Sequence, residues 1–239
     1  MKTITRSCVL MLAGFLVILC AAPQAMAVDA KAMVCVGNVE VRKPGDKDWK
    51  PLTDGTALPQ GTQVLTHPGS TCSIKLGDSA IELGPDTFAT MTNLEPIKVD
   101  MQSGRIYALV RNLRPGSEFK VASPTAVCAA RGTGWVQTTN DVACYEGTLL
   151  VQGADGSEAE IPEGYSIQTN TSGLGDTAEL TDAQMQQGLS QGANLAEQTG
   201  AGQGGAESTA DPLKEQTTEE EAQESGRDIQ GNNEISPSR

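Results

Sequence analysis

The chain has 239 residues, of which 17 are Lys or Arg and 30 are Asp or Glu, so its formal net charge is −13 at pH 7. This charge disfavours nucleic acid and anionic lipid as partners, and no basic stripe in the sequence overrides it locally. We therefore expect neither class of partner.

The first 27 residues have the pattern of a secretory signal peptide. Lys2 and Arg6 lead into an unbroken apolar run at residues 9–19, and Ala25-Met-Ala27 fits the small-x-small rule of signal peptidase. The run is shorter than the roughly 20 residues that cross a membrane, so we favour cleavage before Val28 over an uncleaved anchor. We expect a bacterial protein that is periplasmic or secreted and soluble after cleavage.

Composition divides the remaining chain near residue 171. Residues 28–170 hold all seven aromatic side chains beyond the signal and are long enough for one buried core. Residues 171–239 hold no aromatic side chain, 13 acidic residues and 3 basic ones, too little apolar surface to offset chain entropy. We predict that this acidic, low-complexity tail is disordered, with a transient helix at residues 180–189.

Residues 28–170 show the alternation of apolar and polar side chains that is typical of β-strands. Glycine precedes an alternating apolar pair at Gly37, Gly104 and Gly147, which suits a turn that enters a strand. No segment has a helical period over three turns. We predict an all-β domain, built as a compact β-roll, a β-helix-like stack or a sandwich. The expected strands include residues 34–41, 72–76, 80–83, 105–110, 135–138, 142–145 and 148–151.

Four cysteines follow the signal: Cys35, Cys72, Cys128 and Cys144. An even number in an oxidising compartment indicates two disulfides. Three pairings are possible, and we favour Cys128–Cys144, which closes a nearby loop, with Cys35–Cys72. A metal site is the alternative, but there is no Cys-x-x-Cys and the one histidine, His67, lies in a Thr-His-Pro-Gly turn. We expect no metal and no cofactor.

An arginine lies between an apolar run and a glycine turn in Arg131-Gly132-Thr133, and Trp135 follows. Such an arginine reaches solvent, pairs with a carboxylate or donates to backbone carbonyls. We expect it to be locked inside the fold, bonded to carbonyls or paired with Glu146, rather than to contact a ligand. The glycines on either side of the threonine are expected to have positive φ, and the tryptophan to lie in the core.

The ordered series of landmarks resembles the FecR-like domain of bacterial envelope proteins. It runs from Gly37-Asn-Val-Glu-Val41 through residues 74–85 to Arg131-Gly-Thr133 and Glu146-Gly147. The regulator that gives the family its name joins a cytoplasmic sigma-binding domain and a membrane span to this periplasmic domain. Only eight residues precede the apolar run here, so we do not expect an anti-sigma role. The resemblance implies an exported, stand-alone protein-binding module.

Enzyme signatures are absent from the sequence, which has no Gly-x-Ser-x-Gly elbow, no phosphate-binding glycine loop and no His-based site. Glycan cleavage would need a carboxylate pair, for which Glu82, Asp86 and Glu146 are the candidates. Acids at strand edges are usually solvated, so we expect no enzyme. We predict an adaptor or sensor that binds another envelope protein, through a strand edge for example. The alternative is a structural protein that contacts cell-wall glycan.

Overall fold

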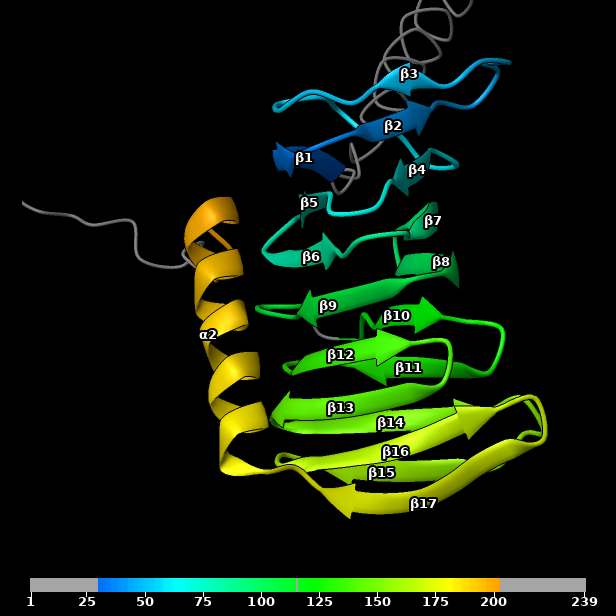
Figure 1. Ribbon diagram of the computed structural model, residues 1–239, viewed down its shortest axis with the longest axis vertical. Helices are drawn as coiled ribbons and strands as arrows, with labels where there is room; N and C mark the ends of the chain where they lie inside the picture. The colour runs from blue at the N-terminus through cyan, green and yellow to red at the C-terminus, as the bar shows by residue number, and fades with distance from the viewer. Residues whose placement is uncertain (1–29, 115, 203–239) are drawn as a thin grey trace, which may run out of the picture. The chain divides into compact units, whose positions relative to one another are not determined.

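The computed structural model describes residues 30–114 and 116–202 of the chain. Two β-sheets face each other around one continuous core, and the helix α2 (Asp182–Thr199) lies against the outer face of one sheet (Figure 1). The predicted all-β fold is confirmed as a two-sheet stack of strands. The predicted signal peptide lies outside the described residues, as do residues 203–239.

One sheet, here called sheet A, has eight strands, and every neighbouring pair is antiparallel. In spatial order they are β1 (Ala30–Val36), β5 (Thr71–Leu76), β6 (Ser79–Leu83), β9 (Arg105–Leu109), β12 (Gly134–Thr138), β13 (Asp141–Glu146), β16 (Tyr165–Asn170) and β17 (Gly173–Glu179).

The other sheet, sheet B, has nine strands, and only β8 and β10 run parallel to each other. In spatial order they are β15 (Glu158–Pro162), β14 (Thr148–Gly153), β11 (Ala126–Ala130), β10 (Phe119–Ala122), β8 (Ile97–Ser103), β7 (Phe88–Leu94), β4 (Gln63–Thr66), β2 (Val39–Arg42) and β3 (Lys50–Pro51).

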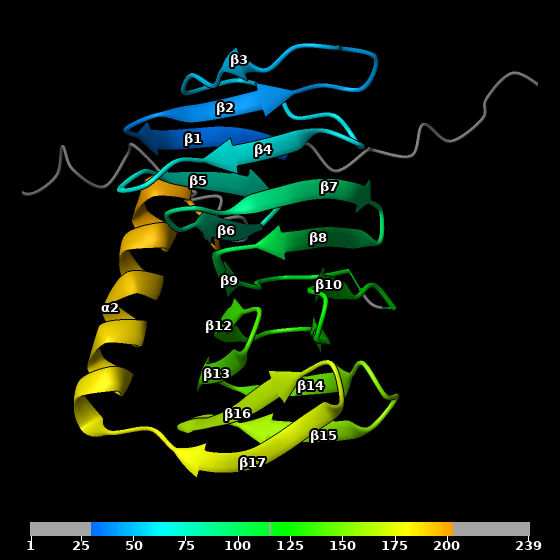
Figure 2. The ribbon, with the colours of Figure 1, turned by 45° about the vertical axis from the view of Figure 1, so that its right-hand side comes forward.

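The chain crosses repeatedly from one sheet to the other as it moves along the stack, so strands close in sequence also lie close in space (Figure 2). Glycines with positive φ precede β2, β9 and β14, where the chain enters a new sheet, as expected for Gly37, Gly104 and Gly147. Gly104 also needs the absence of a side chain, because a Cβ there would overlap Thr87.

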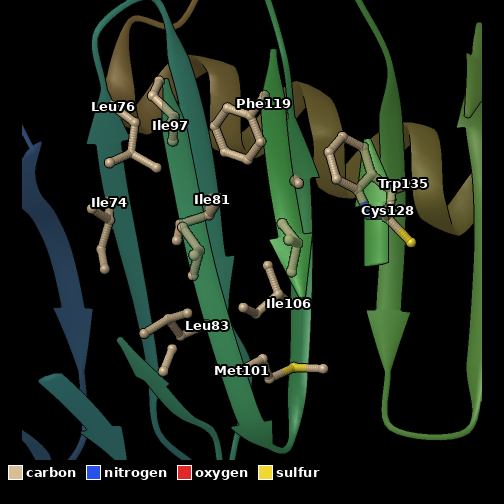
Figure 3. Packing of buried hydrophobic residues seen from close by; sticks show 14 of the residues in the cluster. Ile74, Leu76, Ile81, Leu83, Ile97, Met101, Ile106, Phe119, Cys128 and Trp135 are labelled. Atoms are coloured by element: carbon tan, nitrogen blue, oxygen red, sulfur yellow. The ribbon is translucent and has the colours of Figure 1, made fainter. Parts of the chain in front are cut away.

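The core fills the space between the sheets with alternate side chains from both. Figure 3 shows Ile81 and Ile106 of sheet A and Phe119 of sheet B among the packed side chains of this core, and all three are fully buried. Trp135 meets Phe119 edge to face, with ring centroids 6.0 Å apart. Each such side chain stabilises the fold by roughly 1.5–3 kcal/mol when it leaves water. The shared core is therefore the main contribution that holds the two sheets together.

The helix α2 packs through its smallest residues. Gly188 lies on the ring of Tyr145 and Gly192 on the hydroxyl of Tyr107, so a Cβ at either position would overlap a tyrosine. Leu195 completes the contact with sheet A. A capping box at Thr181 begins the helix, which ends at Gly200 in the left-handed conformation.

The structure therefore extends the domain beyond the expected boundary at residue 170. Residues 171–202, predicted to be a disordered tail, contribute β17 and α2 to the same compact unit as the preceding strands. The predicted helix at residues 180–189 is longer than expected, and it is docked. Its buried face was missed because glycine adds nothing to an apolar pattern, whereas the large apolar Leu189 is 41% exposed.

Candidate functional site

Three connections that cross between the sheets lie side by side at one edge of the stack. They comprise residues 110–114 and 116–118, residues 131–133, and residues 146–147, which we call the crossing loops. The Val110 amide donates to the Thr133 carbonyl at 2.8 Å. The connections pack so closely that a Cβ at Gly147 would lie 2.9 Å from the carbonyl oxygen of Gly132. The sheets thus hold these loops in fixed positions.

Arg131 does not have the buried role that the sequence suggested. Its side chain is 68% exposed, and its closest carboxylate is Glu118, with 3.8 Å between Nη2 and Oε1. Arg111 takes the expected role instead: it pairs with Glu146 and donates to the carbonyl of Val110 at 3.2 Å. Arg131 begins the connection after β11 has ended, so the chain can turn this side chain to solvent.

The residues that follow Arg131 have structural roles, although the two glycines differ from the prediction. Neither Gly132 nor Gly134 has positive φ, which corrects the prediction. Gly134 is small because a Cβ there would lie 3.2 Å from the Tyr107 hydroxyl. Thr133 is buried, and Trp135 lies in the core as predicted. The Thr133 Oγ1 and the Trp135 Nε1 are buried without a hydrogen-bond partner among the described residues.

The four cysteines fall into two different environments. Cys35 and Cys72 lie at disulfide distance and join β1 to β5, with 4.2 Å between their Cα atoms. Cys128 and Cys144 are free, buried thiols, so the second predicted disulfide is not formed. Burial raises the pKa of the Cys128 thiol above its usual range and that of Cys144 to about 11. Burial and the raised pKa values both disfavour the reactive thiolate form in the folded protein.

A pocket of about 450 Å³ opens beside the crossing loops. Its walls come from β1, the end of β5 with the β5–β6 turn, the β7–β8 turn, and the connection between β9 and β10. The volume is within the range of ordinary ligand sites. Its lining has an apolar part, made by Leu76, Leu94, Ile97 and Leu113, and a charged part, made by Lys31, Lys75, Arg111, Arg114, Asp78, Glu95 and Glu118.

This pocket contains a local basic cluster that the sequence reading did not anticipate. Lys31 and Lys75 lie far along the chain from each other and from Arg111 and Arg114, so no short window of the sequence contains all four. Strand order brings the first two onto neighbouring strands, and the connection after β9 supplies the other two. The prediction from net charge missed this cluster because the chain as a whole is acidic.

Other site chemistry has little support among residues 30–114 and 116–202. No group of three or more His, Cys, Asp or Glu side chains there could hold a metal ion. No helix in those ranges is both long and apolar enough to cross a membrane. Of the acids considered for glycan cleavage, Glu82 accepts from Gln191 of α2 at 2.6 Å and Glu146 pairs with Arg111.

The sequence and the structure were compared with known protein families, curated proteins and solved structures. No curated protein matches the sequence. Two crystal structures of a putative anti-sigma factor from Parabacteroides distasonis ATCC 8503, at 1.65 and 2.50 Å resolution, are similar, with TM-scores of 0.43 and 0.44 and 15% identity. Each match covers 49% of this chain and 59% of the other. Residues 62–150 match the family described as FecR protein, so a FecR domain runs from β4 to the start of β14 and includes the crossing loops.

Proposed function

We propose that this chain is a non-enzymatic protein-binding module of the bacterial envelope, acting as an adaptor or sensor. The observation that carries the proposal is the match of residues 62–150 to the FecR family. The periplasmic or secreted location belongs to the proposal and rests on the signal-peptide pattern of residues 1–27.

The partner's contact surface is assigned to the crossing loops and the adjoining pocket. Charged side chains on loops that a rigid scaffold positions are common recognition elements. Arg114 and Arg131 both present mostly exposed guanidinium groups here. The outer face of sheet A is less suitable, because α2 covers its central strands.

Site-specific photocrosslinking in cells tests this assignment. A photoreactive residue is placed at Arg114 or Arg131, and, as the matched control, at Leu150 on the outer face of sheet B, which is 42% exposed. We expect the two loop positions to capture the same envelope protein and Leu150 to capture none. N-terminal sequencing of this chain after its purification from cells tests export. We expect the mature chain to begin at Val28.

Two outcomes would count against the proposal. If only the Leu150 position captures an envelope protein, the binding surface lies on the outer face of sheet B instead. Saturable binding to purified cell-wall glycan, with no protein captured at any position, would favour the structural, glycan-contacting role.

A further inference from the structure

The pocket beside the crossing loops contains an uncompensated pair of lysines. Lys31 on β1 and Lys75 on β5 are directly opposite each other in the antiparallel register, and both line the pocket. Like charges in opposite positions of neighbouring strands destabilise a sheet. Neither lysine forms an ion pair with another described residue, whether with the pocket acids or elsewhere.

A second lysine pair in the same molecule shows how such a repulsion is ordinarily relieved. Lys98 on β8 and Lys120 on β10 are also directly opposite each other. There each ammonium group has its own carboxylate, at 3.1 Å from Asp100 and at 2.9 Å from Glu118 respectively. The lysines of the pocket lack this compensation, so their charge is available to a ligand.

The other charges of the pocket are largely engaged. Arg111 pairs with Glu146, and Arg114 lies 3.1 Å from Glu95. Glu118 is shared by Lys120 and Arg131. Among the pocket acids, this leaves only Asp78 without an ion pair in the described residues.

The C-terminus of α2 partly explains why Lys75 is tolerated without an ion pair. A Cβ at Gly200 would lie 3.7 Å from the Lys75 Nζ, and the last turn of the helix contains no basic residue of its own. The helix dipole therefore favours a cation here. This effect stabilises one ammonium group but supplies no counter-ion for Lys31.

We propose that the pocket binds an acidic peptide segment, a carboxylate of which bridges Lys31 and Lys75 while an apolar side chain packs on Leu94 and Leu113. The inference rests on the proposed protein-binding function and names the chemistry of the partner. The rest of the domain favours this choice of site. All 12 basic residues of the range 30–202 lie before residue 132, whereas residues 132–202 contribute 10 acidic residues and no basic one. An acidic ligand is thus repelled by the C-terminal strands and attracted to this pocket.

A binding assay with the full chain, after removal of the signal, tests the proposal. The probe is a fluorescent, end-capped peptide of alternating Glu and Leu, compared with the same peptide built from Gln and Leu, and binding is followed by anisotropy. We expect the double variant Lys31→Gln/Lys75→Gln to bind the Glu peptide at least tenfold more weakly, because charge-assisted contacts to both lysines are lost. The matched variant Lys98→Gln/Lys120→Gln removes the same charge and should weaken binding by less than about threefold, because it reaches the pocket only through Glu118, which loses its pairing with Lys120.

Stability provides a second readout that does not depend on the probe. Removal of the uncompensated pair should raise the melting temperature or leave it unchanged, whereas removal of the compensated pair should lower it. This measurement also shows that both double variants fold.

The proposal is overturned if the Gln peptide binds as tightly as the Glu peptide, or if both double variants lose affinity equally. It is also overturned if only phosphatidylglycerol vesicles bind, since the lysines would then serve a lipid surface. Photocrosslinking separates this failure from that of the proposed function. A Lys31→Gln/Lys75→Gln chain that still captures the envelope partner at Arg114 would refute the acidic-segment inference alone.

Discussion

The outer faces of the two sheets differ in what covers them. On sheet A, Tyr107, Leu109 and Val136 are buried beneath α2, so the strands β9 and β12 are buried on both faces. On sheet B, the corresponding face carries Lys98 and Leu150, which are partly exposed. The comparison teaches that one face of the stack is closed by the chain's own C-terminal segment, whereas the other faces solvent within the described residues.

Among changes that test the difference between the two faces, removal of α2 should lower the free energy of unfolding most. A chain that ends at Leu180 should be less stable than one that ends at Gly202 by about 3–5 kcal/mol. The loss comes from re-exposing Tyr107, Leu109 and Val136 and from losing the burial of Leu195, and it is offset in part because residues 181–202 no longer have to be ordered. Urea denaturation of the two chains measures it. Equal midpoints would mean that the helix does not close sheet A.

The next effect concerns the two glycines that bring α2 close to the sheet. Gly188→Ala should destabilise the domain by about 1–2 kcal/mol, because overlap with the Tyr145 ring outweighs the roughly 1 kcal/mol gain in helix propensity. In a Tyr145→Ala background the same change should become neutral or stabilising. The exposed Ser190→Ala substitution on α2 is the control, with a change of at most a few tenths of a kcal/mol. A destabilisation that persists without the tyrosine ring would contradict this packing.

A matched pair of valines compares the two faces directly. Val136 lies under α2 and is 6% exposed, whereas Val127 on sheet B is half-buried. Val136→Thr should cost about 1–2 kcal/mol, because it places a hydroxyl group in an apolar contact. Val127→Thr should cost less than about 0.5 kcal/mol, because water still reaches the hydroxyl group. Thermal melting of both variants checks this, and equal losses would refute the difference between the faces.

The smallest effect appears at alkaline pH. Burial, followed by the nearby Glu146, raises the pKa of Tyr107 above its usual range, and burial also raises that of Tyr145. Above about pH 10 the unfolded chain therefore releases tyrosine protons that the folded chain keeps, so the free energy of unfolding falls as pH rises. Tyr107→Phe should remove about 1 kcal/mol of the loss between pH 9 and pH 11. Urea midpoints at the two pH values test this, and an identical loss in both proteins would contradict it.

Most of the strands could be predicted from the sequence because their alternation reflects burial on one face. Residues 72–76 and 80–83 alternate in this way, and they became β5 and β6. The FecR match was also predictable, because ordered glycines and strands such as those around Gly104 and Gly147 are local features.

The rest depended on contacts that no local pattern contains. The buried face of α2 includes Gly188 and Gly192, which a count of apolar residues does not register, so the helix was expected to be transient. Arg131 was expected to be bonded to carbonyls or paired with Glu146, but the connection after β9 brings Arg111 to this carboxylate instead. The lysine pair of the pocket follows from the register of β1 and β5, which are separated in sequence by three strands of the other sheet.

Hydrogen–deuterium exchange of the full chain, read by mass spectrometry, tests most directly the claim that α2 closes one face of the stack. We predict that peptides from residues 182–199 are protected to the same order as those from β9 and β12, because helix and strands open together. Exchange of the helix within seconds while the strands stay protected would show that it does not dock, and would leave both sheet faces open to a partner.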